Sequence, residues 1–231
     1  MDGTIVDTEP YWMVSEGTLV RSFGGEWTHE DALGVVGWGL GDAATRFQAA
    51  GVTLGVEEIV EWMTADVLRQ VAVEVPWRPG ARELLAELKS SGVPTALVTM
   101  SLHRMAEVIV DAIGFPAFDV IVGGDDVAQA KPHPAPYLHA AELLSVDIAE
   151  CVAIEDSVPG VQSAFSSGAT TIAVPLHSPI EERPGLTLWP TLDGRTVADL
   201  SALLPTRASG SADSDSGSAT SDTTGSGSTR G

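Results

Sequence analysis

The feature of this sequence that most constrains its fold is a regular alternation of helical and extended patterns from residue 79 to about residue 175. Amphipathic stretches such as RPGARELLAELKSSGV, with Leu84, Leu85 and Leu88 on one face, are separated by short apolar runs rich in strand-forming residues. The apolar runs are PTALVT, FDVIVG, CVAIE and TTIAV. Strands that alternate with helices predict an α/β protein with a parallel sheet and helices on both of its faces.

Residues 9 to 78 have a different pattern, with helical spacing and no convincing strand. YWMVSEGTLVRSF and VEEIVEWMTADVLRQVAV are amphipathic, and GVVGWGLGDAATRF between them supplies a glycine-rich bend and another helix. One face of the last helix carries Ile59, Met63, Val67 and Val71. We therefore predict an all-helical insertion at residues 9–78, within a discontinuous core domain made of residues 1–8 and 79–205.

The composition changes abruptly after residue 205, to ASGSADSDSGSATSDTTGSGSTRG. A stretch of Ser, Gly, Asp and Thr has almost nothing to bury, so it cannot offset the entropy lost on ordering. We predict a disordered tail at residues 206–231.

Charge and cysteine content limit the partners and the compartment. The formal net charge is −20, and the only lysines are Lys89 and Lys131. Such a field repels phosphate backbones and anionic lipid, so we expect neither nucleic acid nor a membrane as partner. The single cysteine, Cys151, excludes an intrachain disulfide and suits a reducing compartment. With neither a signal peptide nor a membrane-length apolar run, the sequence predicts a cytoplasmic protein, which we expect to be a monomer.

Residues that carry chemistry fall at the ends of the predicted strands. Thr99 closes ALVT, Lys131 follows the next strand in AKPHP, and the pair Glu155-Asp156 closes CVAI. An Asp-Gly-Thr run begins at Asp2, at the head of the chain. Because ligands of a parallel sheet bind at the carboxyl ends of its strands, we expect these side chains to form one site.

Taken in this order, the segments resemble the haloacid dehalogenase superfamily, in its branch with a helical cap inserted after the first motif. The resemblance covers roughly residues 1 to 205. It rests on DGTIVDTEP, PGARELLAELKSSGVPTALVTMS, FDVIVGGDDV, KPHPAPYLHAA and AIEDSVPGVQSA. It implies a Rossmann-like core with a helical cap, and a Mg²⁺-dependent phosphatase that acts on a small phosphorylated metabolite.

The first motif of that family reads Asp-x-Asp-Gly-Thr at the end of the central strand, with the first Asp as nucleophile and the second as general acid and base. Asp2 matches the second Asp, so the resemblance implies that the nucleophile and the whole first central strand lie upstream of Met1. A carboxylate nucleophile would form an aspartyl-phosphate that water then hydrolyses. If Met1 were the true start, the chain would instead be an inactive binding protein of the same fold.

The resemblance also assigns a metal site and a phosphate site. Asp156 would bind Mg²⁺ directly, the backbone carbonyl of Asp2 would be a second ligand, and Glu155 would act through water. Lys131 would supply a positive charge to the nucleophile and the phosphate, and Thr99 would hydrogen-bond the transferring phosphoryl group. The Met100 backbone N–H would join Thr99 in that contact.

Two residues bear on the choice among branches of the family. Trp12 stands where members resembling beta-phosphoglucomutase carry a histidine, which favours a phosphatase and leaves a sugar-phosphate mutase as the alternative. Asp2 disfavours dehalogenation, because a halide leaves without a proton. The absence of lysine from residues 9–78 excludes the phosphonate-cleaving branch. Trp12 and Trp38 are candidates for the cap side of the substrate cleft.

Overall fold

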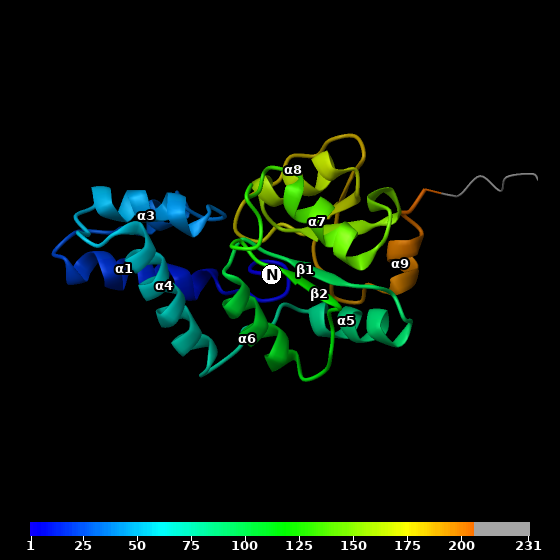
Figure 1. The fold of residues 1–231 in the computed structure, drawn as a ribbon, viewed down its shortest axis with the longest axis horizontal. Helices are drawn as coiled ribbons and strands as arrows, with labels where there is room; N and C mark the ends of the chain where they lie inside the picture. Colours follow the sequence, from blue (N-terminus) through cyan, green and yellow to red (C-terminus); the bar gives the residue numbers. More distant parts are fainter. Residues whose placement is uncertain (206–231) are drawn as a thin grey trace, which may run out of the picture.

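The computed structural model describes residues 1–205, so the tail at residues 206–231 that the sequence predicts as disordered lies outside the described residues. The molecule has two parts side by side along its long axis (Figure 1). One part contains only helices and loops between Glu9 and Val71, and the other contains the parallel strands with their covering helices. Among the described residues, no helix is long and apolar enough to cross a membrane.

The helices of the first part, called the cap helices below, pack against one another around α4. They are α1 (Glu9–Ser22), α2 (His29–Leu33), α3 (Leu40–Ala49) and α4 (Val56–Val71). Both α1 and α3 contact α4, and the apolar face expected for α4 is buried. The short helix α2 was not predicted; Thr28 begins it with a capping box in which its hydroxyl accepts from the backbone N–H of Asp31.

The alternating elements of the second part follow the order that the sequence predicts as far as β4. They are α5 (Ala81–Ser90), β1 (Ala96–Val98), α6 (His103–Ile113), β2 (Val120–Val122), α7 (Ala135–Leu144), η1 (Ile148–Glu150), β3 (Val152–Glu155), α8 (Val158–Ser167), β4 (Thr170–Ala173), β5 (Leu186–Leu188) and α9 (Val197–Ser201). The α/β class with parallel strands is confirmed. The sequence analysis missed β5 and α9, which lie beyond the alternating pattern of residues 79 to about 175.

The strands form two parallel sheets. β1 pairs with β2, and β3, β4 and β5 pair in that order. Helices α7 and α8 cover one face, and α5 and α6 lie on the other (Figure 1). Within residues 1–205, β1 and β3 are not hydrogen-bonded to each other, so β1 and β3 each have one edge without a strand partner.

An apolar cavity of about 380 Å³ lies between those two edges. Leu97 and Val98 line it from β1, Ala153 lines it from β3, and Leu84 lines it from α5. Met1 lies at its border, where this cavity meets the smaller one described next. The cavity therefore separates the two sheets and leads to the head of the chain.

Candidate active site

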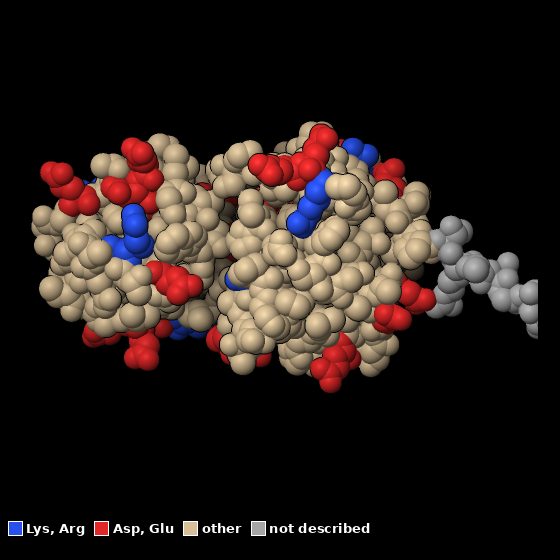
Figure 2. All heavy atoms as spheres, turned by 90° about the horizontal axis from the view of Figure 1, so that it is seen from above, with Lys and Arg blue, Asp and Glu red and all other residues tan. Residues whose placement is uncertain are grey.

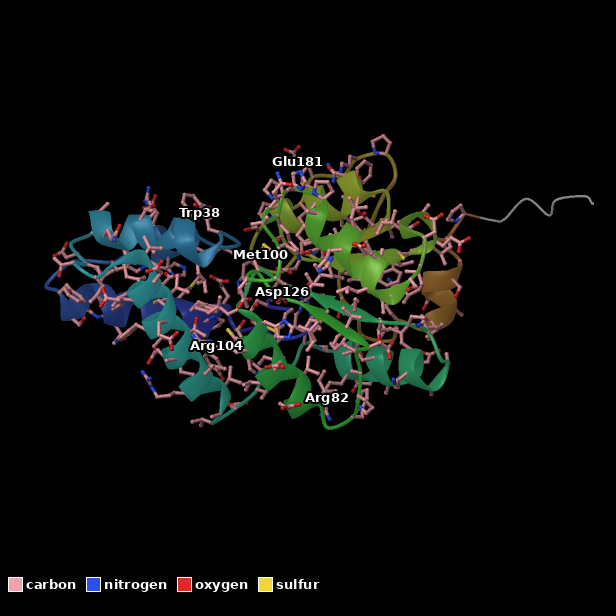
Figure 3. The ribbon with its side chains drawn as sticks, in the orientation of Figure 1. Trp38, Arg82, Met100, Arg104, Asp126 and Glu181 are labelled. Carbon is pink, nitrogen blue, oxygen red and sulfur yellow. The ribbon has the colours of Figure 1, made fainter. Side chains whose placement is uncertain are left out.

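A second cavity, of about 130 Å³, lies between the cap helices and the carboxyl ends of β1 and β3. The space-filling view shows a hollow between the two parts, with Asp and Glu spread over both and few Lys or Arg among them (Figure 2). All the site residues named from the sequence line this cavity: Asp2, Trp12, Trp38, Thr99, Met100, Lys131, Glu155 and Asp156. Trp38 lies in the part with the cap helices and Met100 in the part with the strands (Figure 3).

The Asp2 carboxylate is held by donors from both parts of the molecule. Ser101, just after β1, donates to Asp2 Oδ2 at 2.7 Å. Trp12 Nε1, on α1, donates to Oδ1 at 3.4 Å, and the hydroxyl of Thr8 donates to the same oxygen. These contacts fix the carboxylate at the boundary between cap and core.

A tight turn brings Asp2 next to Asp156. The amide of Gly3 donates to the carbonyl of Val6 at 2.7 Å, and Gly3 has a φ of 70°. A Cβ at Gly3 would lie 2.0 Å from Asp156 Oδ2. Glycine is therefore required here for both its backbone conformation and its lack of a side chain. Arg78 donates to the carbonyls of Gly3 and Val174, which ties the turn to the end of β4.

Lys131 forms a buried cluster with Glu155 and Tyr137. Its ammonium group pairs with Glu155 Oε1 and donates to the carbonyl of Val98 at 3.0 Å, and its side chain is 8% exposed. The hydroxyl of Tyr137 donates to the same carboxylate oxygen. Burial alone would raise the pKa of Glu155, but the charge and hydrogen bond of Lys131 hold it below its usual value. Burial and the neighbouring carboxylate raise the pKa of Tyr137 well above its usual value.

Asp156 lies beside this cluster with a weaker partner. Thr4 Oγ1 donates to Asp156 Oδ1 at 2.8 Å. Burial, and then the charge of Glu155, raise the pKa of Asp156 to about 6. A cation bound to this carboxylate would therefore relieve an unfavourable buried negative charge.

The oxygen atoms at this position fit Mg²⁺. That ion is held by one or two carboxylates and keeps several waters, and the Asp156 carboxylate, which lines the cavity, is a ligand of the kind it uses. No group of three or more His, Cys, Asp or Glu side chains in the described part of the chain has the arrangement of a metal site. Lys131 and Tyr137 both engage Glu155 Oε1, so that oxygen is not free to bind a metal.

Thr99 and Met100 form the floor of the cavity between Asp2 and Lys131. Thr99 is buried at the end of β1, where its amide donates to the carbonyl of Val122 at 2.9 Å. Its hydroxyl accepts from the amide of Ser101 at 3.2 Å. The Met100 sulfur accepts from the backbone amide of Lys131 at 3.3 Å, which draws the loop after β2 against the end of β1.

The opposite wall of the cavity contains two acidic residues that the sequence analysis missed. Glu9, Trp12 and Glu16 follow the spacing i, i+3, i+7 on α1, and all three line the cavity. Glu16 is buried, and its Oε2 accepts from Trp27 Nε1 at 2.9 Å. Burial raises the pKa of Glu16 to about 7, and burial together with the charge of Glu16 raises the pKa of Glu9 to about 8. The sequence signal that could have identified Glu9 and Glu16 was their helical spacing from Trp12.

The fold and the site define a class of enzyme. A parallel α/β core places a lysine, paired acids and a threonine at its strand ends, and helices cover them. The model of the haloacid dehalogenase-like hydrolase family matches residues 1–168, and the chain belongs to that family of enzymes.

Named relatives extend this result. Hexitol phosphatase B of Escherichia coli (strain K12) is 31% identical over 179 residues, which are 76% of this chain and 81% of that protein. The bifunctional riboflavin kinase/FMN phosphatase of Arabidopsis thaliana is 34% identical over 185 residues, and this chain spans only 47% of that protein.

Solved structures agree on the architecture. CbbY from Rhodobacter sphaeroides in complex with phosphate has a TM-score of 0.79 and 29% identity, and the match covers 87% of this chain and 96% of that chain. A CbbY mutant in complex with xylulose-(1,5)bisphosphate has the same TM-score, with 28% identity and the same coverage. The chain is therefore a hydrolase with relatives that are named phosphatases.

Proposed function

We propose that the protein is a Mg²⁺-dependent phosphatase that hydrolyses the phosphate monoester of a small phosphorylated sugar or polyol through an aspartyl-phosphate. The observation that carries this proposal is the buried Lys131, the only Lys or Arg among the described residues that line the cavity, set against Asp156 and Glu155. A fixed cation beside a metal-binding carboxylate suits the equatorial oxygens of a transferring phosphoryl group. Relatives named hexitol phosphatase and phosphorylated carbohydrates phosphatase favour a carbohydrate substrate.

Two displacements at phosphorus make up the reaction. A carboxylate attacks the phosphorus, the ester P–O bond breaks, and the leaving alkoxide takes a proton from Asp2. Water then attacks the same phosphorus and gives its proton back to Asp2, which releases inorganic phosphate and the free carboxylate. Lys131 and the hydroxyl of Thr99 bind the phosphoryl oxygens in both steps. Mg²⁺, held by Asp156 and the Asp2 carbonyl, would supply positive charge to those oxygens.

The nucleophile in this proposal is a carboxylate two residues ahead of Asp2, at the end of a strand that fills the cavity between β1 and β3. That cavity is apolar, its two long sides are strand edges without partners, and it ends at Met1. A central parallel strand is apolar on both faces, which matches this lining.

Hydrolysis is favoured over phosphoryl transfer to a second sugar. Trp12 donates from its indole N–H to the Asp2 carboxylate, and it stands where the resemblance implies a histidine in the mutase branch. An indole N–H is a donor only, so it cannot exchange a proton with a sugar hydroxyl. The mutase alternative would require that exchange to gate water out.

The test compares the protein that begins at Met1 with one that also carries the residues encoded directly ahead of Met1. We expect Mg²⁺-dependent hydrolysis of hexitol and hexose monophosphates, together with a more cooperative thermal transition, only in the extended protein. Asn in place of the carboxylate two positions before Asp2 should abolish turnover and keep the transition. Robust Mg²⁺-dependent hydrolysis by the protein that begins at Met1 would overturn the assignment of the nucleophile.

A further inference from the structure

The loops that follow β1 and β2 carry different parts of the active site and lie tightly against each other. The loop after β1 carries Thr99 and Met100, and the loop after β2 carries Lys131. The amide of Lys131 donates to the Met100 sulfur at 3.3 Å. The amide of Gly124 donates to the carbonyl of Ser101 at 2.9 Å, and a Cβ at Gly124 would lie 2.3 Å from the Met100 carbonyl oxygen. The position of Lys131 therefore depends on how these two loops are joined.

His103, the first residue of α6, makes the side-chain contact that joins the two loops. Its Nδ1 lies 2.5 Å from Asp126 Oδ2, and its backbone amide donates to Asp125 Oδ1 at 2.7 Å. The same oxygen of Asp126 accepts from the amide of Gly123 at 2.7 Å, at the start of the loop after β2. Within the described part of the chain, His103 and Asp126 form the only hydrogen bond between a side chain of residues 99–103 and a side chain of residues 123–134.

Electrostatic interactions strengthen this contact. The hydrogen bond with Asp126, together with the charge of Asp126, raises the pKa of His103 above its usual value. Burial opposes the ionisation of Asp126, but the hydrogen bond with His103 lowers the pKa of Asp126. Glu107 of the same helix lies 3.8 Å from His103 Nε2 and favours the imidazolium as well. A hydrogen bond between an imidazolium and a carboxylate is stronger than one between neutral groups.

We infer that His103 is a positioning residue for Lys131: through Asp126 it holds the loop after β2 in the place that keeps the lysine at the active-site cavity. Lys131 lines that cavity, and its side chain is 8% exposed. His103 lies outside the lining, so it acts through the loop and not on a ligand. The inference rests on the proposed function only for the statement that Lys131 binds a phosphate.

Arg104, the next residue of α6, provides a matched comparison because it faces the other part of the molecule. Its guanidinium group pairs with both carboxylate oxygens of Glu61 on α4, one of the cap helices. Arg104 lies toward the cap helices, and Asp126 lies toward the strands (Figure 3). Arg104→Gln therefore removes an ion pair from the same turn of α6 and leaves the contact between His103 and Asp126 in place.

Amide hydrogen exchange, measured by NMR on the protein that begins at Met1, tests the joint between the loops directly. In His103→Ala we expect the amides of Gly124 and Lys131 to exchange about tenfold faster than in the parent, because both donate across that joint. His103→Asn restores an N–H donor near the place of Nδ1 and should keep exchange within about threefold of the parent. Arg104→Gln should leave both amides unchanged. Unchanged exchange in His103→Ala, or equal acceleration in Arg104→Gln, would overturn the inference.

Binding of inorganic phosphate, measured by calorimetry with Mg²⁺ present, tests the consequence for Lys131. Lys131→Ala should weaken binding about tenfold and His103→Ala about threefold, and the double variant should bind no more weakly than Lys131→Ala alone. Where Lys131→Ala weakens binding, a further loss in the double variant would show that His103 acts apart from Lys131 and would overturn the inference. Equal binding by the parent and Lys131→Ala would instead refute the phosphate-binding role of Lys131 in the proposed function, and the exchange rates would still decide the role of His103.

Discussion

Glu16 and Glu155 lie on opposite walls of one cavity and are equally buried, each 5% exposed, but their pKa values move in opposite directions. Glu155 has a lysine and a tyrosine hydroxyl on one oxygen, and these keep it charged. Glu16 has a single indole N–H, and burial dominates. The partner, and not the depth of burial, therefore decides which form of a buried carboxyl the fold stabilises. On the core wall the fold favours the charged carboxylate, and on the cap wall it favours the protonated carboxyl.

Removing Lys131 should have the largest effect on activity. It leaves Glu155 buried without a cationic partner, which is the environment that Glu16 already has. In the extended protein, Lys131→Ala should lower kcat about 10²–10³-fold, the usual cost of losing a fixed charge at a phosphoryl group. Steady-state hydrolysis of a hexose monophosphate measures it.

Lys89→Ala is the control for that variant. Lys89 pairs with Asp119 at 3.3 Å on the surface, and both side chains are about 40% exposed, so its loss should leave kcat unchanged and stability within about 1 kcal/mol. Turnover by Lys131→Ala within threefold of the parent would contradict the role given to this lysine.

Asp156→Asn tests whether Asp156, on the core wall of the cavity, binds Mg²⁺. The substitution keeps the shape of the side chain and its contact with Thr4, and it removes the charge that a Mg²⁺ ligand needs. We expect Mg²⁺ affinity, measured by calorimetry, to fall about a hundredfold, and Glu155→Gln to lower it about tenfold, since that residue acts through others. Unchanged Mg²⁺ binding by Asp156→Asn would place the metal elsewhere.

Glu16→Gln should have the smallest effect, a change in the pH dependence of stability. The pKa of Glu16 rises from the ordinary value of 4.5 to about 7 on folding. Between those two pH values the folded protein keeps a proton that the unfolded chain releases, so stability falls as pH rises through this window. The variant has no such proton, and its Tm should fall by a few degrees less between about pH 5 and pH 8.

Glu57→Gln serves as the control: Glu57 is exposed in the first turn of α4, so its loss of charge should leave the pH profile of Tm as it is in the parent. Parallel profiles for the parent and Glu16→Gln would show that Glu16 is already ionised at low pH. The contrast with Glu155 would then be lost.

The residues on the core wall of the active-site cavity could be predicted from the sequence, and the acidic residues on its cap wall could not. Thr99, Lys131 and Asp156 stand at strand ends, and the rule for parallel sheets brings strand ends together whatever the details of packing. Tyr137 was missed because it lies within α7, where an aromatic residue predicts core packing, and its hydroxyl reaches Glu155 only through the tertiary fold. Glu16 was missed because a glutamate on a helix predicts a solvated face.

Local and long-range features of the fold differed in the same way in how far the sequence predicts them. Residues 79 to 175 have strong local periods, so their order of elements was predictable. The cavity between β1 and β3 is a property of strand pairing, which depends on residues far apart in the chain. The capping box that begins α2 was visible in the sequence only as Thr28 followed by Asp31.

Each acid of the core wall lies against a glycine. A Cβ at Gly3 would lie 2.0 Å from Asp156 Oδ2, and a Cβ at Gly160 would lie 2.0 Å from Glu155 Oε2. Sensitivity to substitution is therefore not confined to residues with functional groups: a saturation survey should find positions 3 and 160 as intolerant as the two carboxylates. Even alanine, the smallest side chain available, would push an acid out of its place, and so the space that these glycines leave empty shapes the cavity as much as the atoms around it.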